Sequence, residues 1–178
     1  MFRPDTIYSK IAYDAILMYV KTGQKIKKEE SEIPPALKLK LACFVSIYEN
    51  KQKLRGCIGS AEPVHDHLYN EIIENAIAAA TSDPRFKPLA EEELNDITIT
   101  VDVLSVPKKV EDMAQLKPHK HGIIIEDDTG KKGLLLPNLD RVDSTEKQIE
   151  IVKKKAGIDK NKSIEDLNIQ FFTTTRYK

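Results

Sequence analysis

Two stretches of the chain are typical of β-hairpins, and they restrict the fold more than any other feature. Residues 40–48, KLACFVSIY, are apolar on both faces of a strand and are followed by a polar ENKQ turn and then by LRGCIG at residues 54–59. Residues 121–137, HGIIIEDDTGKKGLLLP, fold back around a DTG turn. Short polar turns between apolar segments are typical of antiparallel pairs. Because such hairpins outnumber possible crossovers, the sequence predicts a mainly antiparallel sheet.

Helices are expected beside these strands. Apolar residues recur every three or four positions in two segments, which is the spacing of one buried helix face, and Asp143 with Glu146 forms a capping box that predicts a third helix. Strict alternation at residues 97–103 predicts a further strand, and residues 169–175, IQFFTTT, predict the last one. The predicted fold class is therefore α+β, with helices covering the sheet. The three helical segments begin at Asp5, Pro63 and Asp143 and end near Gly23, Ala80 and Gly157.

The size and composition predict one water-soluble globular domain over residues 1–178. A chain of this length is long enough for one core, and no stretch has the roughly 20 consecutive apolar residues of a membrane helix. The first ten residues have none of the features of a secretory signal, so we expect a cytoplasmic location and no membrane partner. Lys plus Arg number 28 and Asp plus Glu number 28, a balance that disfavours nucleic-acid binding.

The chain has two cysteines, Cys43 and Cys57, too few for a disulfide framework. An even-length turn in the first hairpin would pair Phe44 with Cys57 and Cys43 with Ile58, which puts the two sulfurs on opposite faces of the strands. The sequence therefore predicts no disulfide and no metal site shared by the cysteines. We expect no cofactor.

LRGCIG is the strongest candidate for a functional site. Arg55, Cys57 and Gly59 share one strand face, where successive residues lie about 7 Å apart, so the guanidinium is expected to reach the thiol. A neighbouring cation favours the thiolate, the form that attacks electrophiles. Gly56 and Gly59 permit close approach by a ligand or by another backbone. The alternative, which spacing alone favours, is an inert buried cysteine with glycines at a bulge or packing contact.

Two segments after LRGCIG also contain candidate ligand-binding residues. Ser60 lies between a strand and an expected helix, where anions often bind, although Glu62 would repel a phosphate there. The DPRF turn begins at Asp83 and is expected to present Arg85 outward, where it could clamp a carboxylate. Pairing with a surface acid such as Glu91 is the alternative for this arginine.

The histidines offer one further candidate. His121 opens an apolar strand and is followed by Gly122; a neutral imidazole there could act as a base if the fold brings it near Cys57. A hydrogen-bonded histidine at a strand end is the alternative. His65 and His67 would point apart on a helix and are poor metal co-ligands, so no metal site is predicted.

The motifs LRGCIG, DPRF, HGI, LLP and KAG follow one another along the chain, and with them the chain resembles the AMMECR family, named for the AMME-syndrome chromosomal-region candidate protein. The matching blocks cover about residues 40–160. The resemblance implies an α+β fold with a larger sheet-containing part, a smaller lobe packed on it, and a cleft between them bordered by LRGCIG. It also implies a prokaryotic setting beside a Memo-type protein and a radical-SAM enzyme as possible partners. It implies no particular reaction.

These observations leave two classes of function open. The first is a binding or accessory protein that holds a small acidic ligand, a peptide or a partner's substrate beside LRGCIG. The second is a cysteine-dependent enzyme with Cys57 as nucleophile, Arg55 as cation and His121 as base. We rank binding first, because it needs no complete catalytic set. The expected ligand-binding residues are Gly56, Gly59, Ser60, Asp83, Arg85 and Gly122.

Overall fold

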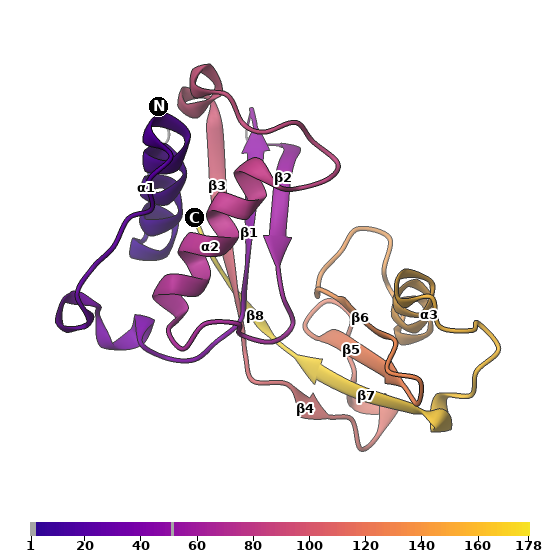
Figure 1. Cartoon of the computed structure of the whole chain (residues 1–178). Coiled ribbons are helices and arrows are strands. Elements are labelled where there is room, and N and C mark those ends of the chain that lie inside the picture. The colour runs from indigo at the N-terminus through magenta and orange to yellow at the C-terminus, as the bar shows by residue number, and fades with distance from the viewer. Residues whose placement is uncertain (1–2, 51) are drawn as a thin grey trace. The chain divides into compact units, whose positions relative to one another are not determined.

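The computed structural model describes residues 3–50 and 52–178. The chain forms two compact units (Figure 1): unit 1 comprises Met1–Val103 and Thr175–Lys178, and unit 2 comprises Leu104–Thr174. Each unit has its own cluster of buried apolar side chains. The expectation of one core is therefore wrong, because two helices pack on one sheet and a third helix packs on the other.

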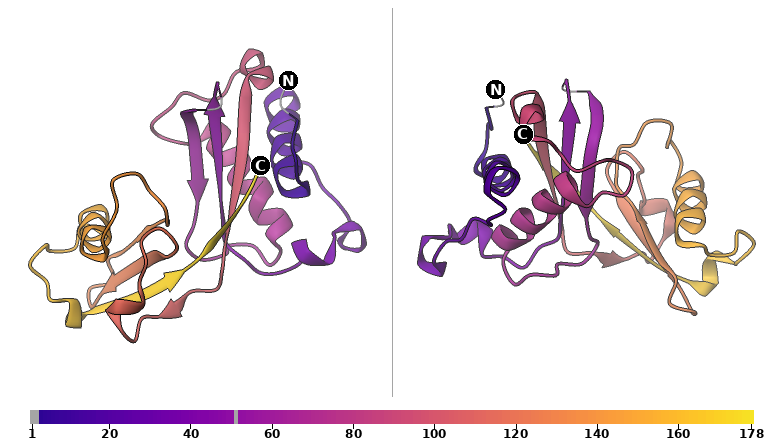
Figure 2. Two further views of the ribbon diagram at one scale, coloured as in Figure 1. Left: turned by 180° about the vertical axis from the view of Figure 1, so that it is seen from behind. Right: turned by 45° about the horizontal axis from the view of Figure 1, so that its top comes forward.

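Unit 1 is built on a four-stranded sheet with the strand order β2-β1-β3-β8. β1 pairs antiparallel with both β2 and β3. Two helices, α1 and α2, lie over one face of this sheet in Figure 1, and the view from behind in Figure 2 shows the strands in front of them. The elements are α1 (Ile7–Thr22), β1 (Cys43–Glu49), β2 (Lys53–Gly59), α2 (Leu68–Thr81), β3 (Ile97–Leu104) and β8 (Thr174–Tyr177).

Local sequence explains the ends of α1 but not the start of α2. Thr6 caps α1, and Gly23 ends it with a φ of 71°, as the expected stop requires. The expected helix start at Pro63 is wrong, because α2 begins at Leu68. The reason lies in Glu71, whose carboxylate accepts hydrogen bonds from backbone N–H groups of the segment before the helix and holds it in a turn.

The first hairpin forms as predicted, but its register differs from the expected one. Cys57 pairs with Ser46, and Ile58 pairs with Val45; the predicted pairs of Cys57 with Phe44 and of Ile58 with Cys43 are wrong. The pairing moves along β1 by two residues. A shift of two keeps the parity, so the two sulfurs still face opposite sides of the sheet. Both cysteines are free thiols.

The two faces of the unit 1 sheet are therefore chemically different. On one face, the Asn75 amide of α2 donates to the Cys43 sulfur at 3.6 Å, which shows that the Cys43 side chain points toward the helix. Val45 and Ile47 share that helix-covered face and are fully buried. The opposite face is called here the polar face. Beside the apolar Phe44 and Leu54, it carries Ser46 and Tyr48 from β1, Cys57 from β2, Thr98, Thr100 and Asp102 from β3, and Arg176 from β8.

Unit 2 has a second antiparallel sheet with the order β4-β7-β5-β6, and one helix, α3, packs on β5 and β6. The second predicted hairpin is confirmed as β5 and β6. The cap of α3 is Ser144 and not the predicted Asp143. The elements are β4 (Lys108–Lys109), β5 (Gly122–Asp127), β6 (Lys132–Leu135), α3 (Thr145–Ala156) and β7 (Leu167–Phe172).

The last predicted strand, residues 169–175, is two strands in the structure. β7 belongs to the sheet of unit 2, and β8 belongs to the sheet of unit 1. The break at Thr173 lets one extended segment supply both sheets. Short 3₁₀ helices occupy Glu30–Glu32, Pro35–Leu37, Glu91–Asn95, Met113–Gln115 and Ile164–Asp166. Across the described residues, no helix is long and apolar enough to cross a membrane.

Candidate functional site

The site is centred on Cys57, whose environment differs from that of Cys43. Cys57 is half-buried on the polar face, and its sulfur lies 3.3 Å from the Ser46 hydroxyl, which donates to it. The two residues face each other across β1 and β2, which brings their side chains together. Cys43 is fully buried under α2, and burial raises the pKa of its thiol to about 12. Only Cys57 is placed to meet a solute.

The DPRF turn closes the outer edge of β2 at Cys57. The backbone N–H of Cys57 donates to Asp83 Oδ2 at 2.9 Å, and its carbonyl oxygen accepts from Arg85 Nη2 at 3.4 Å. Because β2 is an edge strand, these backbone groups would otherwise be unpaired. Asp83 and Arg85 thus take the place of a neighbouring strand. The sequence prediction that they belong with LRGCIG has a structural basis.

Arg85 is held by a buried carboxylate. Asp83 is 4% exposed and accepts from Arg85 Nε at 3.0 Å and from Nη2 at 2.7 Å. This hydrogen bonding from Arg85, with help from the Cys57 N–H, holds the pKa of Asp83 well below its usual range despite burial. Arg85 itself is exposed. Its guanidinium is therefore fixed in direction and still open to solvent.

A second arginine is held in the same way on the polar face. Arg176 donates from Nε and Nη2 to the two oxygens of Asp102 at 2.8 and 2.9 Å, and Asp102 is 2% exposed. Hydrogen bonding to Asp102 raises the pKa of Arg176, and the nearby charges of Tyr48 and Cys57 add to the rise. Among the described residues, Nη1 of Arg176 and Nη1 of Arg85 have no partner. Two fixed guanidinium groups therefore lie near Cys57.

Arg55, the predicted cation beside Cys57, serves another purpose. It binds the Glu93 carboxylate at 2.7 and 3.0 Å and donates to the carbonyl oxygen of Lys87 at 3.0 Å. The hydrogen bonds from Arg55 to the Glu93 carboxylate lower the pKa of Glu93. The irregular pairing after Ile47 explains the difference, because Gly56 and Leu54 both pair with β1 while Arg55 between them has no partner there. The expectation that Arg55 reaches the thiol is not met.

The three candidate glycines are each explained by contacts inside the protein. A Cβ on Gly56 would lie 2.2 Å from the carbonyl oxygen of Ala79 in α2. A Cβ on Gly59 would lie 2.5 Å from the Phe44 ring, and one on Gly122 would lie 2.4 Å from the ring of Phe172. The sequence left open whether a ligand or the protein itself approaches the glycines of LRGCIG. Close packing of protein atoms accounts for all three glycines.

Ser60 belongs to the loop before α2 and not to an anion site. Its hydroxyl contacts the Glu62 carbonyl oxygen and donates to Glu71 Oε1 at 3.3 Å. Glu71 is 2% exposed and also accepts from the N–H groups of Val64 and His65. The carboxylate therefore occupies the position that an anion would take.

His121 and Gly122 lie in unit 2, whereas Cys57 lies in unit 1. The His121 Nδ1 accepts a hydrogen bond from the Lys117 N–H at 3.2 Å, and the ring centre lies 5.0 Å from that of Phe171. Burial and the neighbouring lysines lower the pKa of His121. Because Nδ1 accepts from Lys117, the neutral ring carries its proton on Nε2. These contacts agree with the alternative of a hydrogen-bonded histidine at a strand end.

The residues that sequence reasoning missed are polar groups inside apolar strands. Ser46 interrupts an apolar run, and Asp102 ends the alternation of ITITVDVL. A buried polar residue needs a partner, which is the signal that could have identified them. The partner of Asp102 is Arg176, which is 74 positions away and cannot be inferred from local spacing.

A pocket of about 920 Å³ opens beside these residues within unit 1. Thr100 forms part of its wall and pairs with Ser46 across the sheet, so a row of polar side chains leads from Cys57 to the pocket. The lining includes Arg3, Tyr48, Thr98, Thr100, Arg176 and Lys178. In the described part of the chain, no group of three His, Cys, Asp or Glu side chains could hold a metal ion.

Comparison with known proteins gives the family of this chain. The profile of the AMMECR1 family matches residues 9–177, which span both units. The chain belongs to the AMMECR1 family. A Thermotoga maritima relative is 43% identical over 171 residues, which cover 96% of this chain and 97% of that protein. The predicted family is therefore confirmed.

Other AMMECR1 relatives differ in length. A Clostridium acetobutylicum protein is 42% identical over 172 residues, yet these cover only 36% of it, so the chain spans about a third of that relative. The crystal structure of an uncharacterized protein from Pyrococcus horikoshii superposes with a TM-score of 0.82 and 30% identity, covering 95% of this chain and 88% of that one. The α+β fold class predicted from the sequence is confirmed.

Proposed function

We propose that this AMMECR1 protein is a binding or accessory protein, and that the polar face of unit 1 around Cys57 holds a ligand carrying a carboxylate. One observation carries the proposal. Arg85 and Arg176 are each fixed by a buried aspartate, and each retains an Nη1 without a partner among the described residues. Guanidinium groups held in this way bind carboxylates at little entropic cost, because their direction is already set.

The polar face supports binding better than it supports nucleophilic catalysis. Acyl or alkyl transfer through Cys57 needs a base within reach of the thiol. The histidines of unit 1, His65 and His67, precede α2 and lie outside the polar face. The nearby carboxylates of Asp83 and Asp102 are bonded to arginine, which makes them weak bases.

A cysteine-dependent enzyme is the second candidate, and the half-buried thiol that accepts from Ser46 favours it. The sequence suggested His121 as its base. Because Nδ1 of His121 accepts from the Lys117 N–H, the ring proton is on Nε2, and Nε2 must lose that proton before it can act as a base. Replacing His121 by Asn tests this candidate. Slower alkylation of Cys57 in the variant at pH 7 would support it, and an unchanged rate would remove it.

A protein partner is a further part of the proposal. The relative in Clostridium acetobutylicum is more than twice as long as this chain, so a domain of this family occurs within a larger protein. This supports a module that works with another protein. We propose a Memo-type or radical-SAM protein as that partner, to be tested by co-purification of the two expressed together.

The experiment that tests the binding proposal compares two alkylating reagents at Cys57. Iodoacetate is a carboxylate and iodoacetamide is its neutral analogue, so the ratio of their rates reports attraction of the carboxylate and cancels the reactivity of the thiol. The ratio should fall about threefold in Arg85→Gln and in Arg176→Gln, as expected for loss of one nearby charge worth somewhat under 1 kcal/mol.

Two controls keep this result specific. Lys10→Gln removes an equal charge from the exposed side of α1, where Lys10 pairs with Asp14, and should leave the ratio unchanged. Cys43 in the same sample should react with neither reagent while the protein is folded. A ratio that is the same in both arginine variants as in the unmodified protein would contradict the proposal.

A further inference from the structure

The pocket beside Thr100 lies on the same polar face as Cys57, and Arg176, which lines the pocket, also interacts electrostatically with Cys57. We infer that this pocket binds a small zwitterion of the amino-acid or short-peptide class. The inference rests on the proposed function, since it names the ligand whose carboxylate the polar face would hold. At about 920 Å³, the pocket has the size of a ligand site and exceeds what a single ion needs.

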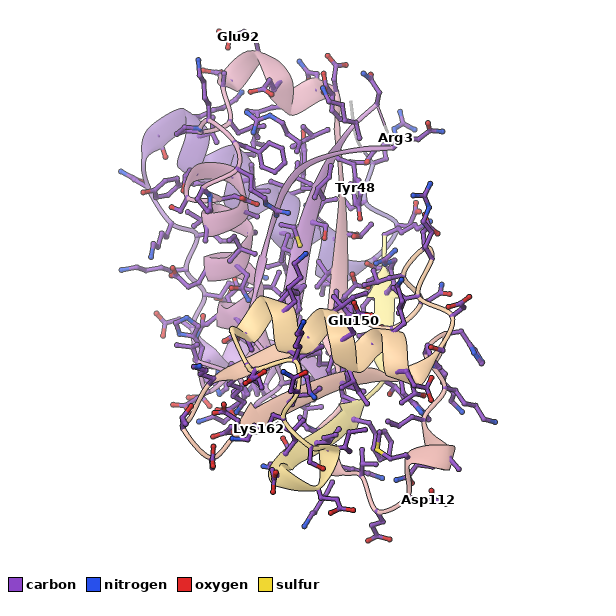
Figure 3. The ribbon with its side chains drawn as sticks, turned by 90° about the vertical axis from the view of Figure 1, so that its right-hand side faces the viewer. Arg3, Tyr48, Glu92, Asp112, Glu150 and Lys162 are labelled. Atoms are coloured by element: carbon purple, nitrogen blue, oxygen red, sulfur yellow. The ribbon has the colours of Figure 1, made fainter. Side chains whose placement is uncertain are left out.

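Charges of both signs line the pocket. Arg3, Arg176 and Lys178 contribute cations, and Asp5 and Asp96 contribute carboxylates. Apart from Arg176, these side chains form no ion pair with another described residue. Figure 3 labels Arg3 and Tyr48, which line the same pocket. A ligand with charges of one sign would meet like charges from one of the two sets, whereas a zwitterion can place each of its charged groups against the opposite set.

Arg176 provides a fixed point for the carboxylate. Its Nε and Nη2 are bound to the buried Asp102 at 2.8 and 2.9 Å, which sets the plane of the guanidinium. Its side chain remains 52% exposed. A guanidinium with a buried aspartate on one side and solvent on the other is preorganised to receive a second carboxylate.

Thr100 provides the second observation. It is 8% exposed and lines the pocket, and its Oγ1 has no hydrogen-bond partner among the described residues. A buried hydroxyl without a partner destabilises the protein, so such a group is expected to have a function. Oγ1 is itself covered in the free protein, so in the inferred complex the Thr100 side chain turns about its Cα–Cβ bond, and a carboxylate or amide oxygen of the ligand accepts from the hydroxyl.

The test uses three related dipeptides in isothermal titration calorimetry. Alanyl-alanine is a zwitterion, N-acetyl-alanyl-alanine is an anion, and alanyl-alanine amide is a cation. The zwitterion should bind at least tenfold more tightly than either blocked form, because each blocked form lacks one charge-assisted interaction of about a factor of ten or more. Equal binding of the zwitterion and a blocked form, or no binding at millimolar concentration, would overturn the inference.

Thr100→Val separates a binding role from a structural one. The variant should weaken alanyl-alanine about tenfold. It should also raise the melting temperature of the free protein, because the unpartnered hydroxyl is gone. A higher melting temperature with unchanged affinity would contradict the role of Thr100 in binding. Lys10→Gln on α1 serves as the matched control that changes neither quantity.

The two proposals can fail separately. If alanyl-alanine does not bind, and the iodoacetate-to-iodoacetamide ratio at Cys57 still falls in the arginine variants as expected, the zwitterion pocket is overturned and the binding proposal stays intact. A flat ratio in both arginine variants, with dipeptide binding that depends on Thr100 and is weakened in Arg176→Gln, would overturn the attraction of a carboxylate to Cys57 and leave the pocket intact.

Discussion

Cys43 and Cys57 lie on adjacent strands of one hairpin, yet they have opposite environments. Cys43 points toward α2, is fully buried, and has a thiol pKa raised to about 12 by burial. Cys57 points to the polar face, is half-buried, and has Ser46 against its sulfur. The difference arises from the alternation of side chains along a strand.

This comparison shows how one sheet can separate packing from recognition. The helix-covered face buries Val45, Ile47 and the other apolar residues that stabilise unit 1. The polar face buries one aspartate, Asp102, and Arg176 binds it. Substitutions on the first face should therefore affect mainly stability, and substitutions on the second should affect mainly binding.

The largest expected effect is on the helix-covered face, at Gly56. The Cβ of Gly56→Ala would lie 2.2 Å from the carbonyl oxygen of Ala79, so α2 must move away from β2. We expect a loss of about 3 kcal/mol in the free energy of unfolding, measured by urea denaturation. Gly23→Ala is the control: its Cβ meets no atom within 4 Å, and only the φ of 71° is unfavourable, so about 1 kcal/mol should be lost. Equal losses would show that α2 does not pack closely on Gly56.

The cysteines themselves should differ next. Cys43→Ser places a hydroxyl in a fully buried site and should cost about 2 kcal/mol of unfolding free energy. Cys57→Ser on the polar face should cost less than about 0.5 kcal/mol, since water and Ser46 can satisfy the new hydroxyl. Comparable losses in urea denaturation would mean that the two faces are not distinct.

Acid should weaken unit 1 through Asp83. Its folded pKa is lowered, first by hydrogen bonds from Arg85, so below about pH 4 the unfolded chain binds more protons than the folded one. The stability contributed by Asp83 is therefore present above that pH and is lost as pH falls further. In Asp83→Asn, stability should fall less between pH 4 and pH 2 than in the unmodified protein. Parallel curves from urea denaturation across that range would contradict this role of Asp83.

The smallest effect on the site is expected from Arg55→Ala. Because Arg55 binds Glu93 and the Lys87 carbonyl oxygen, its loss should cost about 1 kcal/mol of unfolding free energy. The alkylation rate of Cys57 should change less than about twofold, which is the effect of a charge with no direct contact to the thiol. A large fall in that rate would restore the interpretation that the sequence first suggested for Arg55.

Local patterns in the sequence predicted much of the fold. Both hairpins, the Gly23 stop and the placement of Cys43 and Cys57 on opposite faces depend on neighbouring residues and on strand alternation. The late start of α2 was missed because it depends on the buried carboxylate of Glu71, which binds the loop before the helix. The split of the last strand was missed because the pattern of one extended segment does not say which sheet each part joins.

The site was predicted only in part, for a similar reason. Asp83 and Arg85 were identified from their motif, and the structure gives both a contact with Cys57. Arg55 was misplaced because the irregular pairing in β2 changes the expected spacing along the strand. Arg176 was missed because its link to Asp102 joins positions far apart in the chain.

The measurement that tests the central claim most directly is the alkylation of both cysteines by iodoacetamide in one native sample, read by mass spectrometry. Cys43 should react only when the protein unfolds, so Cys57 should react at least about a thousandfold faster. That result would establish the polar face as open to solutes. If both cysteines react together and only on unfolding, the polar face is closed, and the account of Cys57 as the centre of a binding site is wrong.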